Sequence, residues 1–120
     1  MHTIITGVHI EITDAIRNYT QEKMQPLEKL IARDDTSAKL SIELSKASNH
    51  RVNGQIFQAE ALIHIRGKET ALRTTQDDLY KAVDVLKDML VRELSQHKDK
   101  ERSMVRRGAH KVKALFKRLI

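Results

Sequence analysis

The 120-residue chain contains no cysteine, no tryptophan and only one proline. Without cysteine it has no disulfide framework, no thiolate metal site and no cysteine nucleophile. No stretch approaches the ~20 consecutive apolar residues that span a bilayer. Its first residues, MHTIITGVHIEITD, lack the basic segment and uninterrupted apolar run of a secretory signal. These absences favour a soluble, unprocessed protein, and we expect it in the cytoplasm.

Motifs of catalysis are missing as well. The chain has no G-x-S-x-G, no P-loop and no G-x-G-x-x-G, and its four glycines stand apart from one another. Its six histidines show no paired ligand spacing. The adjacent carboxylates Asp77 and Asp78 are more typical of helix capping than of acid-base chemistry. We therefore expect no enzymatic activity, no small-molecule substrate, no cofactor and no metal site.

Positive charge is concentrated at one end of the chain, whose net charge is +6. Residues 1–96 carry 13 Lys or Arg against 14 Asp or Glu, whereas residues 97–120 carry 9 against 2. With 40% hydrophobic residues, the length fits one small domain. We predict a folded domain over 1–96 and a basic tail over 97–120, disordered when free and helical on contact. Such a tail favours nucleic acid over an anionic membrane, because bulky aromatics are scarce.

The clearest helical pattern lies in residues 75–100. Apolar residues recur there at spacings of four, three, four and four, on one stripe of an α-helix: Leu79, Val83, Leu86, Leu90 and Leu94. Thr75 or Asp77 is expected to cap the first turn. Lys81 and Arg92 fall opposite this stripe, and Tyr80, Lys87 and Lys98 lie along one flank.

A second helix is predicted after the first strand. Thr13 is expected to cap it, and its inner stripe runs to about residue 31: Ile16, Thr20, Leu27 and Ile31. Pro26 interrupts this helix, because proline has no N–H for the helical hydrogen bond. The last turn is therefore predicted to be a separate short piece.

Alternation of apolar and polar residues predicts four strands. The first covers residues 2–6, the second centres on residues 40–44, and residues 47–54 connect it to the third. The third alternates without a break: Phe57, Ala59, Ala61, Ile63 and Ile65. A tight turn at residues 66–68 leads into the fourth strand, over residues 69–75.

The resulting order is β-α-β-β-β-α, which predicts an α+β fold with both helices on one face of a four-stranded sheet. The other face is expected to be wet, with Gln58, Glu60 and His64 exposed on the third strand. Basic residues follow the last helix into the tail as one continuous positive strip: Lys81, Lys87, Arg92, Lys98, Arg102, Arg106 and Arg107. This strip carries no base-stacking aromatics, so it suits phosphate contacts and shape recognition of folded RNA.

Three segments of the chain carry a family resemblance, in order and at matching separations. They are ITGVHIEITDAIR (residues 5–17), EKMQPLEKL (22–30) and DLYKAVDVLKDMLVRELSQHK (78–98). The sequence resembles the ribosome hibernation-promoting factor and ribosome-associated inhibitor family. The resemblance implies a fold related in shape to double-stranded RNA-binding domains. It also implies a short form, because 24 residues after Gln96 are too few for the separate C-terminal dimerising domain of longer members.

The resemblance also implies a partner, the small ribosomal subunit and its rRNA. The domain would occupy the decoding region, exclude mRNA and tRNA, and keep idle ribosomes inactive, while remaining a monomer when free. The family's rRNA-contacting positions fall on Lys23, Lys29, Lys81, Lys87, Arg92 and Lys98, with Arg17 a weaker candidate. Two alternatives stay open: a general module for structured RNA, and an interaction module whose tail helix docks on a membrane or a protein.

Overall fold

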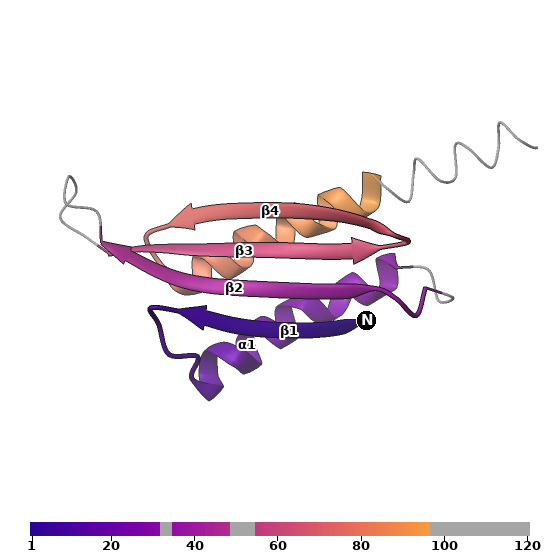
Figure 1. The fold of residues 1–120 in the computed structure, drawn as a ribbon. Helices are drawn as coiled ribbons and strands as arrows, with labels where there is room; N and C mark the ends of the chain where they lie inside the picture. Colours follow the sequence, from indigo (N-terminus) through magenta and orange to yellow (C-terminus); the bar gives the residue numbers. More distant parts are fainter. Residues whose placement is uncertain (32–34, 49–54, 97–120) are drawn as a thin grey trace, which may run out of the picture.

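The structure, a computed structural model, describes residues 1–31, 35–48 and 55–96 (Figure 1). The chain forms β1 (His2–Val8), α1 (Asp14–Met24), the 3-10 helix η1 (Gln25–Leu30), β2 (Lys39–Ser48), β3 (Gln55–Ile65) and β4 (Lys68–Gln76). A last helix follows, whose described part covers residues 79–96 and which we call helix 79–96. The predicted α+β class and the order β-α-β-β-β-α are confirmed.

The four strands form one sheet in the order β1-β2-β3-β4. β1 and β2 are parallel because α1 carries the chain back between them, whereas β3 and β4 are each antiparallel to the strand before. Arg66 and Gly67 connect β3 to β4, and both have positive φ angles, 51° and 78°. Two consecutive positive φ angles match the twist of a two-residue hairpin turn. The predicted tight turn is therefore confirmed.

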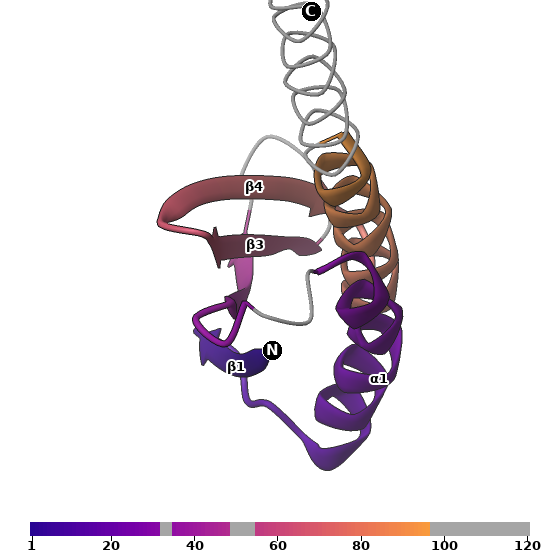
Figure 2. The same cartoon turned by 90° about the vertical axis from the view of Figure 1, so that its right-hand side faces the viewer.

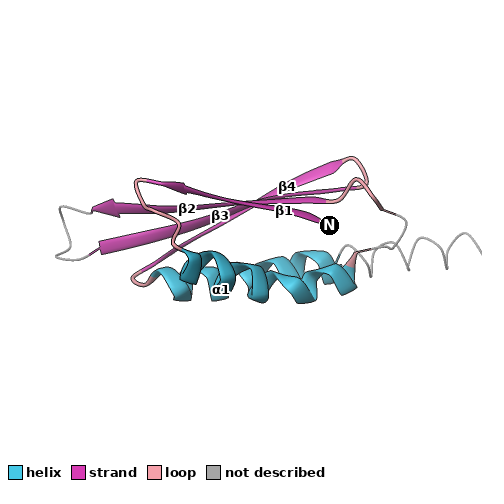
Figure 3. Ribbon diagram, turned by 90° about the horizontal axis from the view of Figure 1, so that it is seen from below, coloured by secondary structure: helices cyan, strands magenta, loops and turns pink. Residues whose placement is uncertain are grey.

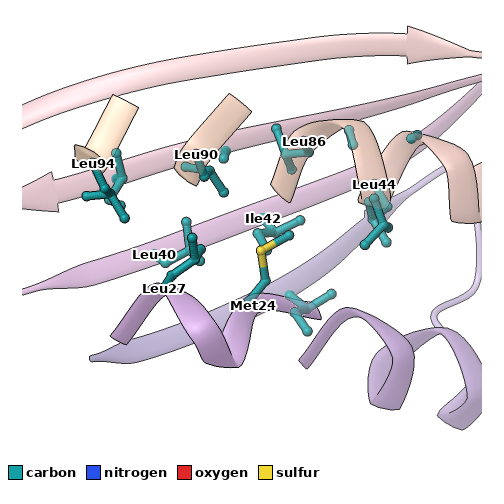
Figure 4. Packing of buried hydrophobic residues seen from close by; sticks show 14 of the residues in the cluster. Met24, Leu27, Leu40, Ile42, Leu44, Leu86, Leu90 and Leu94 are labelled. Carbon is teal, nitrogen blue, oxygen red and sulfur yellow. The ribbon is translucent and has the colours of Figure 1, made fainter. Parts of the chain in front are cut away.

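Both helices pack on the same face of the sheet (Figure 3), and they lie side by side across it (Figure 2). The core fills the space between the two layers. Leu40, Ile42 and Leu44 of β2 are 0 to 1% exposed. Around them gather side chains from both helices (Figure 4): Met24, Leu27, Leu86, Leu90 and Leu94. Each such side chain contributes about 1.5–3 kcal/mol when it is fully buried.

The first helix begins and breaks where local chemistry predicts. The N–H of Ile16 donates to Oγ1 of Thr13 over 3.3 Å, so Thr13 is the N-cap. α1 ends at Met24, and Pro26 stands at the start of η1. Leu27 of η1 is fully buried, so the 3-10 turn extends the apolar stripe although the α-helix has stopped. The predicted separate last piece is confirmed.

Two predicted boundaries are wrong. The cap of helix 79–96 is neither Thr75 nor Asp77, because β4 continues to Gln76 and includes Thr75. Instead, Oδ1 of Asp78 accepts the N–H of Lys81 over 3.0 Å. β2 likewise runs to Ser48, so the predicted connection at 47–54 begins later, and its residues 49–54 lie outside the described residues. In both places strand pairing with β3 extends the sheet beyond the alternating apolar residues.

A close approach of the chain to itself precedes α1. A Cβ atom added to Gly7 would lie 2.5 Å from the carbonyl oxygen of Ile10 and 2.9 Å from Cγ1 of Ile12. The loop that leaves β1 therefore folds back against the strand, where only glycine leaves room. This contact brings Ile12 to the edge of the core and sets the point from which α1 starts.

Candidate nucleic-acid interface

The predicted RNA-binding residues that the structure describes all belong to the helix layer. Lys23 lies in α1, Lys29 in η1, and Lys81, Lys87 and Arg92 in helix 79–96. None of them is on the sheet. The remaining four lie outside the described residues: Lys98, Arg102, Arg106 and Arg107. The helix layer is therefore the candidate interface.

Three of the five described cations are paired with carboxylates. Nζ of Lys23 lies 3.5 Å from Oδ1 of Asp84, which belongs to the other helix. Lys81 pairs with Asp77 at 3.6 Å and Lys87 with Asp88 at 3.9 Å, both within one helix region. Lys29 and Arg92 have no ion pair with any other described residue. Of these two candidates, Lys29 lies in η1 and Arg92 in helix 79–96, whereas the candidate in α1, Lys23, is paired.

The prediction of a continuous positive strip is wrong for the described residues. Residues 14–30 carry three basic and three acidic side chains, and residues 77–96 carry three basic and five acidic ones. Acidic side chains separate the lysines because the turns that present Lys81 and Lys87 also present Asp77, Asp84 and Asp88. The helix layer is a mosaic of both signs, with a net charge of −2 over these two ranges.

These ion pairs do not prevent the lysines from binding phosphate. The side chains of Lys23, Lys81 and Lys87 keep 41%, 58% and 30% of their surface exposed. Pairs at this exposure contribute about 0–1 kcal/mol, and they are screened by salt. Breaking such an ion pair to bind another anion therefore costs little free energy.

A cluster between the two helices holds their outer surfaces in place. The hydroxyl of Tyr19 donates to Oδ1 of Asp84 over 2.5 Å. The rings of Tyr19 and Tyr80 meet edge to face, with centroids 4.8 Å apart and an interplanar angle of 77°. Nζ of Lys23 stands 5.6 Å from the centroid of the Tyr19 ring. α1 and helix 79–96 are thus joined by a polar and aromatic contact.

The same hydrogen bond changes the acidity of Tyr19. Donation to the Asp84 carboxylate favours the protonated phenol, and burial and the nearby charge of Asp84 act in the same direction. Together they raise the pKa of Tyr19 to about 12. The hydroxyl therefore stays protonated, and able to donate to Asp84, throughout the physiological pH range.

Sequence reasoning missed this cluster. The sequence pattern places Tyr19 beside the inner stripe of the first helix and Tyr80 on a flank of the last helix. Both placements hold in the structure. Whether two flanks meet depends on the rotation and spacing of two packed helices, and no periodic pattern in either helix reports these quantities. The only available signal was that each tyrosine borders an apolar stripe.

The open face of the sheet has a different character. Arg73 pairs with Glu60 at 3.0 Å across neighbouring strands, and Nδ1 of His64 lies 3.8 Å from Oε1 of Glu69. Ile4 and Leu62 are 45% and 42% exposed and stand in one row across the sheet, with Ser41 between them. The expected exposure of the polar side chains on β3 is met only in part. Gln58, Glu60 and His64 are half-buried because cross-strand neighbours cover part of each.

The described residues contain neither a metal site nor a membrane-spanning helix. Among residues 1–31, 35–48 and 55–96, no three His, Asp or Glu side chains gather as metal ligands. No helix within these ranges is long and apolar enough to cross a membrane. A hollow of about 230 Å³ lies between the start of the chain and the first helix with η1, and is lined by Met1, Thr3, Gln21, Met24, Gln25 and Glu28.

Comparison with known proteins agrees with this architecture. Residues 3–102 match the family described as Sigma 54 modulation protein / S30EA ribosomal protein. The chain is 33% identical over 101 residues to the ribosome hibernation promoting factor of Azotobacter vinelandii, covering 84% of this chain and 86% of that protein. It is 31% identical over 100 residues to the factor of the same name from Escherichia coli K12, covering 83% and 96%.

Solved structures share the fold. A ribosomal subunit interface protein from Coxiella burnetii superposes with a TM-score of 0.64 at 25% identity, covering 82% of this chain and 99% of that one. The N-terminal domain of Thermus thermophilus Protein Y superposes with a TM-score of 0.62 at 24% identity, covering 81% and 99%, and shows the fold alone. The sequence match, the strand order and the two-helix layer lead to one conclusion: this chain belongs to the Sigma 54 modulation protein / S30EA ribosomal protein family of ribosome hibernation-promoting factors.

Proposed function

We propose that this protein binds the decoding region of the small ribosomal subunit, excludes mRNA and tRNA, and thereby inhibits translation in resting cells. The observation that carries the proposal is the family match over residues 3–102. It is supported by curated relatives that are named ribosome hibernation promoting factors. All five described candidate cations lie in one layer, so a single face can meet rRNA.

In this proposal the protein acts by occupying space. No bond is made or broken, so no catalytic group is required, and the protein works in the cytoplasm as a monomer until it binds. Lys29 and Arg92 contact phosphates directly, since they have no competing carboxylate among the described residues. Lys23, Lys81 and Lys87 exchange their carboxylate partners for phosphates. Recognition then depends on shape and on the spacing of cations rather than on net charge.

The test is a competition on purified small subunits. Full-length protein is added to subunits carrying mRNA and initiator tRNA, and the bound tRNA and bound protein are both measured after sedimentation. We expect tRNA occupancy to fall as protein occupancy rises. Unchanged tRNA at saturating bound protein would contradict steric exclusion, and absence of co-sedimentation would contradict binding itself.

The basic tail is a second part of this proposal. Residues 97–120 carry nine basic and two acidic side chains, and we propose that they add phosphate contacts outside the folded domain. The same sedimentation assay, repeated over a range of salt, compares full-length protein with protein truncated after Lys100. Three lost phosphate contacts would flatten the slope of log affinity against log salt by about two to three units. An identical slope would remove the tail from the interface.

A further inference from the structure

Tyr80 is an exposed aromatic ring in the middle of the candidate interface. It keeps 43% of its surface accessible, although it belongs to the first turn of a helix that packs on the sheet. Leu79 and Ala82, its neighbours on the helix, turn toward the core. The sequence-based interpretation counted no stacking aromatic on the basic strip. The structure shows that Tyr80 exposes part of its ring on the same layer as the candidate cations.

Tyr19 packs against the ring of Tyr80. In an edge-to-face pair, the edge of one ring meets the face of the other, so Tyr19 covers at most one face of Tyr80. Tyr19 is itself fixed by its hydrogen bond to Asp84 and by Lys23 above its ring. The contact with Tyr19 therefore helps to set the orientation in which the Tyr80 ring is exposed.

Two lysines lie near this part of the surface. Lys23 stands 5.6 Å from the centroid of the Tyr19 ring, which contacts Tyr80, and Lys87 follows Tyr80 by two turns of the helix, about 10 Å along its axis. Asp84, four residues after Tyr80, is occupied by Tyr19 and Lys23. A flat apolar ring beside phosphate-binding cations is the combination by which proteins hold unpaired nucleotides: the base stacks and the backbone phosphate meets the lysine.

We propose that Tyr80 is a stacking platform for one unpaired nucleobase of RNA, and that Lys23 binds the adjacent phosphate. This inference rests on the proposed function and deepens it, because it assigns a base contact to an interface otherwise made of phosphate contacts. A protein partner would also use an exposed tyrosine. The flanking lysines favour a nucleotide, and the experiment separates the two.

The first measurement is the affinity of full-length protein for purified small subunits. Tyr80→Phe keeps the ring and is expected to bind within about twofold of the original protein. Tyr80→Leu keeps an apolar side chain without a π-face and is expected to bind roughly five- to a hundredfold more weakly. Equal binding by Tyr80→Leu would overturn the proposal. So would an equal loss in Tyr80→Phe, since the hydroxyl would then be the group that matters.

The second measurement observes the ring directly in the original protein and uses a variant only to assign the signals. The chain contains only two tyrosines, so full-length protein with ¹³C-labelled tyrosine has two sets of ring signals, which Tyr80→Phe assigns. A short oligoadenylate is the probe, and an abasic ribose-phosphate chain of equal length is its control. Stacking is expected to shift the Tyr80 ring protons upfield with oligoadenylate alone. Equal shifts with oligoadenylate and with the abasic control, or no shift at saturating oligoadenylate, would overturn the stacking proposal.

The two measurements keep this inference separate from the proposed function. If the original protein binds subunits, but neither Tyr80→Leu nor oligoadenylate has an effect, stacking is wrong and the function stands. If subunit binding is absent while oligoadenylate shifts the Tyr80 ring, the function is wrong and stacking stands. Weaker subunit binding by Tyr80→Leu without any base-dependent shift would assign Tyr80 to a protein contact and overturn the nucleobase proposal.

Discussion

The helix-covered face of the sheet buries Leu40, Ile42 and Leu44 almost completely, whereas the open face leaves Ile4 and Leu62 nearly half exposed. Both faces come from the same strands, on alternate residues. The difference shows that an apolar side chain on a strand stabilises the fold only where a second layer covers it. One face of this sheet supports the domain, and the other forms part of its surface.

The open face of the sheet and the outer face of the helix layer both carry charges of mixed sign. The open face places Lys39 and Arg73 among three glutamates, Glu43, Glu60 and Glu69. The helix layer is equally mixed, since three of its lysines meet aspartates. Net charge therefore does not identify the interface within the folded domain. We propose the helix layer instead because the described candidate cations, taken from the family resemblance, all lie on it.

The largest expected effect concerns burial on the two faces. Leu86 is fully buried against the sheet and Leu62 is 42% exposed on the open side. Leu86→Ala is expected to lower the free energy of unfolding by about 2–5 kcal/mol, because it leaves a cavity. Leu62→Ala removes the same atoms with a loss within about 1 kcal/mol. Thermal or urea unfolding measures both, and comparable losses would contradict the assignment of a single core.

A smaller effect concerns binding by the two surfaces. The double variant Lys81→Glu with Arg92→Glu is expected to weaken small-subunit binding at least tenfold, which corresponds to about 1.4 kcal/mol. Its matched control on the open face is Lys39→Glu with Arg73→Glu. Each pair combines one cation that has an ion-pair partner with one that has none among the described residues.

Both double variants change the net charge equally, so a nonspecific electrostatic effect would weaken both alike. We expect the open-face variant to bind within about twofold of the original protein. Co-sedimentation at fixed salt gives both affinities, and unfolding curves check that both variants fold. Equal loss in the two variants would remove the helix layer as the preferred interface.

The smallest expected effect concerns the contact between the helices. In Tyr80→Phe protein the only tyrosine is Tyr19, so tyrosinate absorbance reports its titration alone. We expect this titration to give a pKa of about 12 for Tyr19. Adding Asp84→Asn removes the carboxylate that accepts the hydrogen bond, and should bring the pKa back toward roughly 10. An unchanged pKa in the double variant would contradict this cause.

The raised pKa also predicts a pH dependence of stability. The folded state holds the Tyr19 proton more tightly than the unfolded state, whose pKa is roughly 10. The stabilisation is therefore complete below that pH and is lost as pH rises toward about 12. Relative to Tyr19→Phe, which cannot ionise, the original protein should lose stability across this window. Parallel unfolding curves at several alkaline pH values measure the difference.

Most of the fold follows from the sequence. The spacing of Ile16, Thr20 and Leu27 predicts the first helix, Thr13 predicts its cap, and Pro26 predicts its break. The alternation from Phe57 to Ile65 predicts β3. These features are local, because the periods of 3.6 and 2 belong to the backbone itself and hold whatever the rest of the chain does.

Only the tertiary structure decides which local features meet. The pairing register of the strands places Ile4 and Leu62, which are far apart in the sequence, in one row across the sheet. The packing of two helices brings Tyr19 and Lys23 to Asp84, and makes Lys23 half of an ion pair between the helices. The basic residues after Gln96 stay a prediction from composition. Which side chains become neighbours depends on the rotation and spacing of whole elements, which the packed core sets and no local period contains.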